Sequence, residues 1–483
     1  MQLDHSFSKE LTSLCSEVKP IKLLNARLAV FNNDLADELN LPPSWQDQQY
    51  LFSALFAQNG QLQTHSLAQK YGGHQFGQWN PELGDGRGLL LTEVIDQKRQ
   101  RWDLHLKGAG PTPYSRFADG RAVLRSTIRE YLASEALHFL GIPTSRALCL
   151  IDSDEPVYRE KQERAAQLIR VCKSHIRFGH FEYFYHSKQP QKLQQLFDYC
   201  FKYHFTECLE SASPYQAMLA RITRDSAKLI AKWQAFGFNH GVMNTDNMSI
   251  HGITFDYGPY AFLDDFDPQF VSNHSDSQGR YSFDSQPGIG LWNLNALAQA
   301  FTPHLDVEQI QLALSQYEPC LLKEYSTLMQ HKLGLMVNSS TSAFHSELIN
   351  SLLDMLSAEN KDYSIIFRQL CEFDVDTDNT NLRDQFVNRE RFEHWAKQYK
   401  LALSNQSLEQ KQRQMAMRQR NPQVILRNYL AQQVIDRAEE GDFTMLNEFI
   451  RALKTPFEST QTSQKFSQPP PAWGKQLEIS CSS

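Results

Sequence analysis

Residues 240–258 read HGVMNTDNMSIHGITFDYG, and in this stretch Asn247 and Asp256 flank a segment that fits a short hairpin. Asn247 stands in the pair DN, and Asp256 stands in FDYG, where the glycine after the aromatic residue allows a sharp turn. Amide and carboxylate oxygens are the ligands that Mg²⁺ prefers. The stretch therefore predicts a loop with two metal ligands, Asn247 and Asp256.

The same stretch lacks a residue that protein kinases need. Kinases supply two such ligands from an asparagine, a short hairpin and an Asp-aromatic-Gly turn, and their catalytic base precedes the asparagine by about five residues. Here that position is Val242, which cannot accept a proton, while Asp246 stands directly beside the metal ligand. This rearrangement favours changed chemistry at least as strongly as lost chemistry.

Upstream of this stretch, three features follow one another in the order of a kinase nucleotide site. A glycine-rich turn holds Gly84, Gly86 and Arg87, the apolar run WDLHL ends at Lys107, and Glu130 lies in the next helical segment. A glycine-rich hairpin is more often only a hairpin, and a strand lysine is normally solvated. The ordered set nevertheless predicts a phosphate-binding lysine that is oriented by a glutamate.

Two further pairs of residues are candidates for the same site. Arg170 and Arg177 lie in the aromatic-rich segment LIRVCKSHIRFGHFEYF, which indicates partial burial and therefore an anionic partner. That partner is a protein carboxylate or a phosphate, with about even odds. Asp119 and Gly120 in RFADGRA fit a simple turn as well as a binding loop.

The bulk composition indicates a globular enzyme-sized chain. It has 483 residues, 41% of them hydrophobic, and a net charge of -7, which gives no bulk attraction for nucleic acid or for an anionic membrane. The N-terminus has no signal-peptide pattern and no segment is apolar enough to span a membrane, so we expect a cytoplasmic protein. The eight cysteines form no CxxC pair, and the histidines, including those at 74, 175, 180, 240, 251 and 274, match no metal-binding spacing.

The pattern of apolar residues divides the chain into two halves. The first half alternates like strands at 86–95, 101–108, 145–151 and 165–172, around one helix at 126–143 that a Ser/Thr cap begins and Gly141 ends. From about residue 190 the spacing is helical, interrupted by 240–258 and by a long polar loop at 264–283. The Ser, Gln and Pro-rich segment from Pro456 is expected to be extended.

Several long motifs together resemble the selenoprotein O family. They are YGGHQFGQWNPELGDGRGLLL, HLKGAGPTPYSRFADGRAVLRSTIREYLASEAL, the segment from Arg170 to Arg177, HGVMNTDNMSI and TFDYGPYAFLD, and the match continues in order to NPQVILRNYLAQ and the terminal CSS. The resemblance implies an α+β, protein-kinase-like bilobal fold. Its parts would be an N-lobe with a sheet and an embedded helix at 1–185, a large helical C-lobe at 186–455 and an extended C-terminal tail at 456–483.

The resemblance also implies a function, namely transfer of AMP from ATP, or of UMP from UTP, to Ser, Thr or Tyr hydroxyls of proteins, the enzyme itself among the candidates. The nucleotide would bind in an orientation flipped relative to kinases, with Mg²⁺ or Mn²⁺ as the ion. Asp246 would be the proton acceptor, Asn247 and Asp256 the metal ligands, and Glu130 a support for Lys107. The nucleotide-binding positions would be Gly84, Gly86, Arg87, Lys107, Asp119, Gly120, Arg170, Arg177 and Asp256.

The sequence departs from the family pattern at one position. Many bacterial members carry a cysteine in the activation loop that can pair with the C-terminal one, whereas this chain has Ser272 there and Cys481 near its end. We therefore do not expect a disulfide between loop and tail. Cys481 lies in a polar segment and is expected to be exposed, and it is either free or paired with a partner or with a different cysteine. Two alternatives to nucleotide transfer stay open, which are conventional phosphoryl transfer with Asp246 as an unusual base and a nucleotide-binding pseudokinase scaffold.

Overall fold

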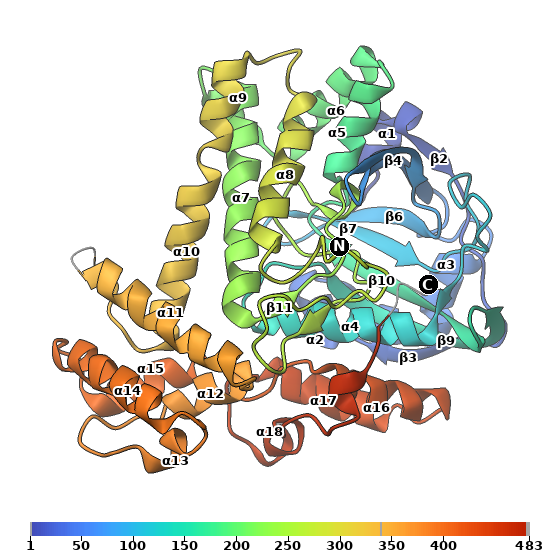
Figure 1. Cartoon of the computed structure of the whole chain (residues 1–483). Helices are drawn as coiled ribbons and strands as arrows, with labels where there is room; N and C mark the ends of the chain where they lie inside the picture. Colours follow the sequence, from blue (N-terminus) through green and yellow to red (C-terminus); the bar gives the residue numbers. More distant parts are fainter. Residues whose placement is uncertain (1, 339–340, 480–483) are drawn as a thin grey trace.

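An antiparallel sheet forms the N-terminal part of the molecule (Figure 1). The structure is a computed structural model and describes residues 2–338 and 341–479. The strand order is β2-β4-β6-β7-β10-β9-β3, with β1 beside β6, β5 beside β4 and β8 beside β10. The strands are β1 Gln2–Asp4, β2 Cys15–Glu17, β3 Arg27–Phe31, β4 Leu67–Gln75, β5 Gln78–Gly84, β6 Gly88–Ile95, β7 Arg101–Lys107, β8 Ala122–Val123, β9 Arg146–Tyr158 and β10 Gln162–Cys172.

Both faces of the sheet are covered, which explains why β6 is apolar along almost its whole length. Leu89 and Leu91 belong to a core that also holds residues of α2 and α3, whereas Leu90 belongs to the core that contains α4. Successive side chains of a strand point to opposite faces, so the two cores lie on opposite sides of the sheet. The helices of this part are α1 Ser6–Glu10, α2 Asn33–Glu38, α3 Gln48–Phe56 and α4 Leu124–Phe139. All four predicted strands are confirmed as β6, β7, β9 and β10.

The embedded helix α4 is confirmed, but the prediction of a Ser/Thr cap was wrong. The helix follows β8 directly, its N-cap is Val123, and no side chain caps it. The hydroxyls of Ser126 and Thr127 instead donate to the Val123 carbonyl, at 3.1 and 2.8 Å. The pairing of β8 with β10 fixes where the helix starts. At the other end Gly141 has a φ of +77°, as expected for the glycine that follows a helix.

The second half of the chain is mainly helical, and its long helices α7 and α10 pack side by side (Figure 1). The segment 191–210 forms α6 and a separate 3₁₀ turn, and the segment 421–453 forms two helices that pack against α4. The remaining elements are α5 Phe178–His186, α6 Pro190–Tyr203, α7 Pro214–Phe236, β11 Phe238–Asn239, β12 Ala261–Phe262, α8 Gln286–Gln299, α9 Val307–Leu314, α10 Tyr317–Lys332, α11 Ser342–Ala358, α12 Tyr363–Leu370, α13 Thr380–Arg383, α14 Arg389–Ser404, α15 Gln410–Arg418, α16 Asn428–Glu439, α17 Thr444–Lys454 and α18 Gln461–Phe466.

The segment after Pro456 differs from the expected extended tail. It contains the short helix α18, which packs on α17 and buries Phe466, because an apolar side chain at this place can complete the core. Farther along, Lys475 forms an ion pair of 2.6 Å with Asp265 of the long loop at 264–283. The predicted exposure of Cys481 lies outside the described residues.

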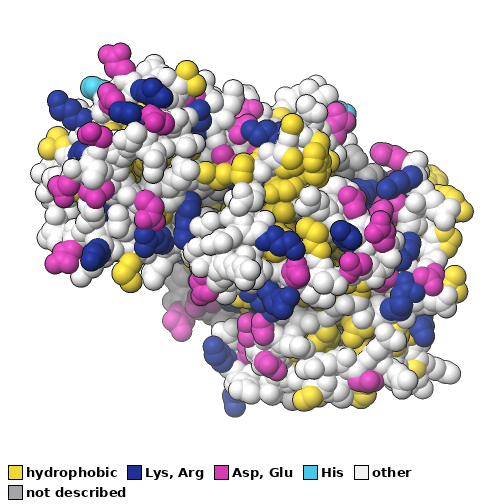
Figure 2. Space-filling view, turned by 90° about the horizontal axis from the view of Figure 1, so that it is seen from below, with side chains coloured by type: hydrophobic (Ala, Val, Ile, Leu, Met, Phe, Trp, Pro, Cys, Tyr) yellow, Lys and Arg dark blue, Asp and Glu magenta, His cyan; other side chains and the backbone are white. Residues whose placement is uncertain are grey.

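A membrane-spanning segment requires a long apolar helix, and a strongly charged surface requires side chains of one sign gathered together. Among the residues that the structure describes, no helix combines the length and the apolar character needed to cross a bilayer. On the face seen in Figure 2, basic and acidic side chains are interspersed. A surface with both signs mixed creates no strong field of one sign on that face.

A buried lysine in the helical half gives a first prediction, on stability. Lys332 of α10 is 3% exposed, and its ammonium group lies over three aromatic rings, with Phe367 nearest at 4.7 Å from the ring centroid. Burial lowers the pKa of Lys332 from 10.5 to about 7. The buried charge therefore lowers the free energy of unfolding most below about pH 7, where Lys332 is protonated in the folded protein. This loss of stability becomes smaller as the pH rises toward 10.5.

We expect Lys332→Met to raise the free energy of unfolding by about 2–4 kcal/mol near pH 6 and by less near pH 9. Urea unfolding at the two pH values measures the difference. Lys323→Met, at an exposed position of the same helix, is the control and should change little at either pH. If Lys332→Met raised the free energy of unfolding equally at both pH values, the buried charge would not be the cause of the increase.

Candidate functional site

A cavity of about 330 Å³ lies between the sheet and the 240–258 loop. The glycine-rich turn between β5 and β6, the end of β7 and the segment after β7 form one side, and the loop residues form the other. Ten of the residues that the sequence predicts for the site line this cavity. They are Gly84, Gly86, Arg87, Lys107, Asp119, Gly120, Arg170, Arg177, Asn247 and Asp256.

Glu130 lies behind the wall of the cavity and binds two of its basic residues. Its carboxylate, 1% exposed, accepts a hydrogen bond of 2.5 Å from Lys107 and also pairs with the guanidinium of Arg170. Burial alone would raise the pKa of Glu130, but the charges of Arg170 and Lys107 hold it below its ordinary value. Burial lowers the pKa of Lys107 to about 8, with Glu130 opposing this shift. The predicted lysine–glutamate contact is therefore present.

Asp256 is a carboxylate that Arg170 and Arg177 share. Arg170 approaches one of its oxygens at 2.8 Å, and Arg177 pairs with the other. The side chain of Asp256 is partly buried, at 21% exposed, which by itself would raise its pKa, but the charges of Arg177 and Arg170 hold this pKa far below its ordinary value. The guanidinium of Arg177 lies between the rings of Tyr71 and Phe255, at 4.5 and 4.6 Å from their centroids. The two arginines thus have carboxylate partners within the protein.

Asp246 has the opposite electrostatic environment. Its side chain is buried, one oxygen has no hydrogen-bond partner among the described residues, and the other is 3.4 Å from the amide of Gln75. Burial raises the pKa of Asp246 to about 7, with Arg177 opposing and the charge of Asp256 adding to the shift. A carboxyl group with a pKa near neutrality can accept a proton from a hydroxyl group.

The residues around Asp246 fit a divalent cation. The side-chain nitrogen of Asn247 donates to the Val242 carbonyl at 3.0 Å, so its oxygen is the atom that is left to bind an ion. The unpartnered oxygen of Asp246 and the carboxylate of Asp256 add negative charge. Oxygen atoms of this kind suit Mg²⁺ or Mn²⁺. Because both oxygens of Asp256 contact arginines, a cation there would compete with these contacts.

The loop that holds Asp119 and Gly120 has a fixed shape. Gly120 has a φ of +68°, and a Cβ atom there would overlap the backbone of Gly110. Both carboxylate oxygens of Asp119 accept from Arg159 at 2.9 Å. These contacts hold the loop in one shape at the wall of the cavity, and only glycine fits this shape at position 120.

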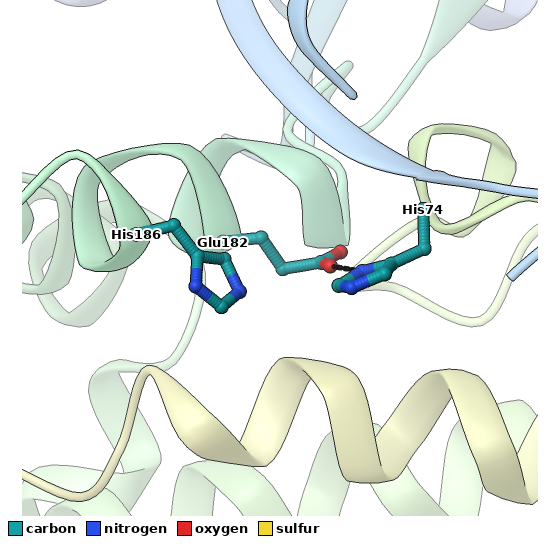
Figure 3. Close-up of side chains that lie close together, drawn as sticks. All are labelled: His74, Glu182 and His186. Atoms are coloured by element: carbon teal, nitrogen blue, oxygen red, sulfur yellow. Dashed lines mark hydrogen bonds and ion pairs between the residues drawn. The ribbon is translucent and has the colours of Figure 1, made fainter. Parts of the chain in front are cut away.

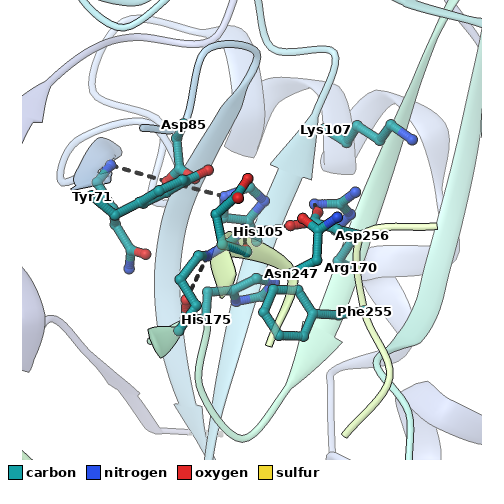
Figure 4. Close-up of polar contacts among 12 residues, drawn as sticks. Tyr71, Asp85, His105, Lys107, Arg170, His175, Asn247, Phe255 and Asp256 are labelled. Carbon is teal, nitrogen blue, oxygen red and sulfur yellow. Dashed lines mark hydrogen bonds and ion pairs between the residues drawn. The ribbon is translucent and has the colours of Figure 1, made fainter. Parts of the chain in front are cut away.

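Sequence reasoning missed a buried cluster in which His105 and Asp85 line the cavity and His175 lies next to them (Figure 4). His105 stacks on His175 with 4.4 Å between the ring centroids, and its Nε2 lies 3.3 Å from an oxygen of Asp85. The backbone nitrogen of His175 donates a hydrogen bond of 2.7 Å to the carboxylate of Asp103. The signal in the sequence was the alternation in WDLHLK, which places Asp103, His105 and Lys107 on one face of β7.

The 240–258 loop is joined to α4, the helix that carries Glu130. The guanidinium of Arg129 donates to the Tyr260 carbonyl at 2.8 Å, and the Tyr260 hydroxyl donates back to the Arg129 carbonyl at 2.7 Å. This reciprocal pair couples the position of Glu130 to the segment that follows Asp256. It therefore helps to fix the position of Glu130 relative to Asp256, the two carboxylates that pair with Arg170.

Comparisons with known proteins agree with one another. Residues 1–454 match the family model described as protein adenylyltransferase SelO. The chain is 60% identical over its whole length to a protein of Pseudoalteromonas atlantica, all of which is covered, and 49% identical to one of Pseudomonas aeruginosa, of which 99% is covered. Both relatives bear the name protein nucleotidyltransferase YdiU.

Proposed function

The chain belongs to the protein adenylyltransferase SelO family, and from this membership we propose that the cavity carries out transfer of AMP from ATP to hydroxyl groups of proteins. The observation that carries the proposal is the division of charge within the site. Lys107 and Arg170 lie at the sheet side of the cavity. On the loop side Asn247 lines the cavity, and the neighbouring Asp246, whose pKa is raised to about 7, lies outside the residues that form the wall. Arg177 bridges the two sides, because it pairs with Asp256 and donates to the backbone carbonyl of Asp246.

This division suits a nucleotide that binds in the flipped orientation. The α-phosphate then lies near Asn247 and Asp256, and pyrophosphate is the leaving group. Lys107, Arg170 and Arg87 stabilise the charge that develops on the departing pyrophosphate, because fixed cations in a buried site stabilise anions more strongly than water does. Glu130 holds Lys107 and Arg170 in place for this role.

Asp246 has the role of accepting the proton of the attacking hydroxyl group. Its carboxyl group is buried, and one of its oxygens lacks a partner among the described residues. This oxygen can take up the proton, and burial favours the neutral form that results. A divalent cation held by Asn247 and Asp256, when bound, supplies positive charge that stabilises the phosphate oxygens. Val242 lines the cavity at the kinase base position and contributes no proton acceptor.

Further features complete the proposal. We infer a kinase-like bilobal arrangement with an N-lobe at 1–185, a helical C-lobe at 186–455 and a C-terminal segment at 456–483. The acceptor groups are Ser, Thr or Tyr hydroxyls, with self-modification included. Mg²⁺ or Mn²⁺ is the ion, UTP is an alternative donor, and the location is the cytoplasm.

Incubation with ATP labelled at either the α- or the γ-phosphate tests the proposal directly. The α-label is expected to enter protein and the γ-label to leave as pyrophosphate. Intact-mass analysis with ATP and with UTP then distinguishes AMP, UMP and phosphate by their increments. Transfer of the γ-label alone would support the kinase alternative, and nucleotide binding without any transfer would support the pseudokinase scaffold.

Lys107→Ala is expected to lower transfer by about a hundredfold or more, the scale for the loss of one preorganised charge in an active site. Single-turnover rates at saturating ATP measure the effect. Lys98→Ala, on the exposed turn between β6 and β7, is the matched control and should leave the rate unchanged. A rate within a fewfold of the unmodified enzyme would remove Lys107 from the set of residues that contact phosphate.

A further inference from the structure

Three side chains outside the cavity converge beside the 240–258 loop, which is called the catalytic loop because it carries Asp246. His74 comes from the end of β4, and Glu182 and His186 lie four residues apart on α5, which places them on one face of the helix. One potential ligand atom from each of the three lies within 4.8 Å of those of the other two. In Figure 3 the carboxylate of Glu182 points toward the ring of His74, with His186 on the adjoining turn of the helix.

The polar atoms of this group are incompletely satisfied. Glu182 is fully buried, and although one of its oxygens pairs with Nδ1 of His74, the other has no partner in the described part of the chain. The Nε2 atom of His186 is also buried without a partner among those residues. A buried carboxylate oxygen and a buried imidazole nitrogen without partners each cost free energy, which a shared cation would recover.

We propose that His74, Glu182 and His186 bind one Zn²⁺ ion, which fastens the β4–β5 hairpin to α5 beside the catalytic loop. Two imidazoles and one carboxylate form a ligand set that Zn²⁺ favours, with water in the fourth position. Ligand atoms around a tetrahedral Zn²⁺ lie about 3.3 Å apart, so small side-chain rotations close the observed group. Mg²⁺ prefers oxygen ligands, which distinguishes this site from the cavity.

Aromatic side chains support the orientation of the two histidines. The ring of Trp79 lies 4.5 Å from that of His186 and 5.3 Å from that of His74, and Trp292 of α8 lies 5.3 Å from His74 on another side. Packing of this kind restricts the imidazole rings to a few orientations. It also forms a hydrophobic shell that limits the access of solvent to the proposed site.

The proposed ion would act on the position of the catalytic loop. The backbone nitrogen of His74 donates to the Thr245 hydroxyl at 2.7 Å, and that of Phe76 donates to the Asn244 side chain at 3.1 Å. The amide of Gln75 reaches Asp246, as described above. A cation that holds His74 against α5 therefore holds the neighbouring residues of the hairpin against the loop that carries Asp246.

Zn²⁺ binding to the full-length protein tests the inference without any nucleotide. Isothermal titration of metal-free protein with Zn²⁺ is expected to show about one tight equivalent, and His186→Gln and Glu182→Gln should weaken it at least tenfold. His394→Gln, at an exposed histidine of α14, is the matched control and should bind like the unmodified protein. His186 is only partly buried, whereas Glu182 is fully buried, so His186→Gln is expected to disturb folding less than Glu182→Gln.

Asp256→Asn separates this site from the cavity, because it removes a cavity ligand and should retain the Zn²⁺ equivalent. Zn²⁺ should also raise the Tm of the unmodified protein and of Asp256→Asn, but not that of His186→Gln. Absence of tight binding, or equal binding by His186→Gln, would overturn the site and leave an ordinary His74–Glu182 ion pair. None of these outcomes depends on nucleotide transfer, so the proposed function and this site fail separately.

Discussion

The Asp256→Ala protein is expected to lose metal-dependent transfer by a hundredfold or more, because the substitution removes a cavity carboxylate that contacts both Arg170 and Arg177 and that we propose as a metal ligand. Alanine also leaves Arg170 and Arg177 without this carboxylate. Asp256→Asn keeps the shape of the side chain and removes only its charge, so the two variants together distinguish lost chemistry from lost structure.

Stability supplies a second readout for Asp256. Its folded pKa is lowered, so its charge contributes stability at pH values above 3.8, and this contribution disappears as the pH falls through the folded value. We expect Asp256→Asn to lower the free energy of unfolding by about 3 kcal/mol near pH 7, the scale for breaking a buried ion pair. Asp378→Ala, at an exposed aspartate, is the control and should change neither rate nor stability. Near-normal transfer by Asp256→Asn would refute the metal assignment.

Asp246→Asn is expected to lower transfer by about 10²–10⁴-fold, the range for loss of a general base. Only the deprotonated carboxylate accepts a proton, so the rate of the unmodified enzyme should rise with pH and level off above about 7. A bound cation moves this midpoint lower because positive charge favours the carboxylate. Single-turnover rates measured across this pH range, with metal and ATP saturating, provide the test.

The same variant should be more stable than the unmodified protein. The pKa of Asp246 is raised from 3.8 to about 7, so in metal-free protein the buried charge costs stability progressively as the pH rises through that window. Asp246→Asn should therefore raise the free energy of unfolding by about 2–4 kcal/mol near pH 8. Asp246 and Asp256 thus give opposite changes in stability and the same loss of activity. Unchanged activity, or a fall in stability with Asp246→Asn, would contradict the role assigned to this residue.

The residues that sequence reasoning found were those with a local signal. The strand that ends at Lys107, the helix that holds Glu130 and the Asn247 to Asp256 spacing could each be identified from periodicity and turn residues within about twenty positions. The order of these motifs then implied that they meet. The structure brings the ten predicted cavity residues together, with Glu130 bonded to Lys107.

Other features could not be inferred because they depend on contacts between distant segments. The sequence left the partner of Arg170 and Arg177 open between a carboxylate and a phosphate, and the fold supplies Glu130 and Asp256. The histidine spacing matched no metal motif, since the proposed Zn²⁺ site joins His74 to residues 108 or more positions away. The start of α4 depended on the pairing of β8 rather than on a cap.

The sequence by itself determined the family and the strands and helices near the site, and it provided the prediction of which side chains bind phosphate or a cation. Periodicity and motif spacing record these properties because they arise between residues close in the chain. Only the tertiary structure decided which charges are paired. Asp246 and Asp256, ten residues apart on one loop, have pKa values shifted in opposite directions. The carboxylate of Asp246 is buried and Arg177 contacts only its backbone carbonyl, whereas the carboxylate of Asp256 forms ion pairs with both Arg170 and Arg177.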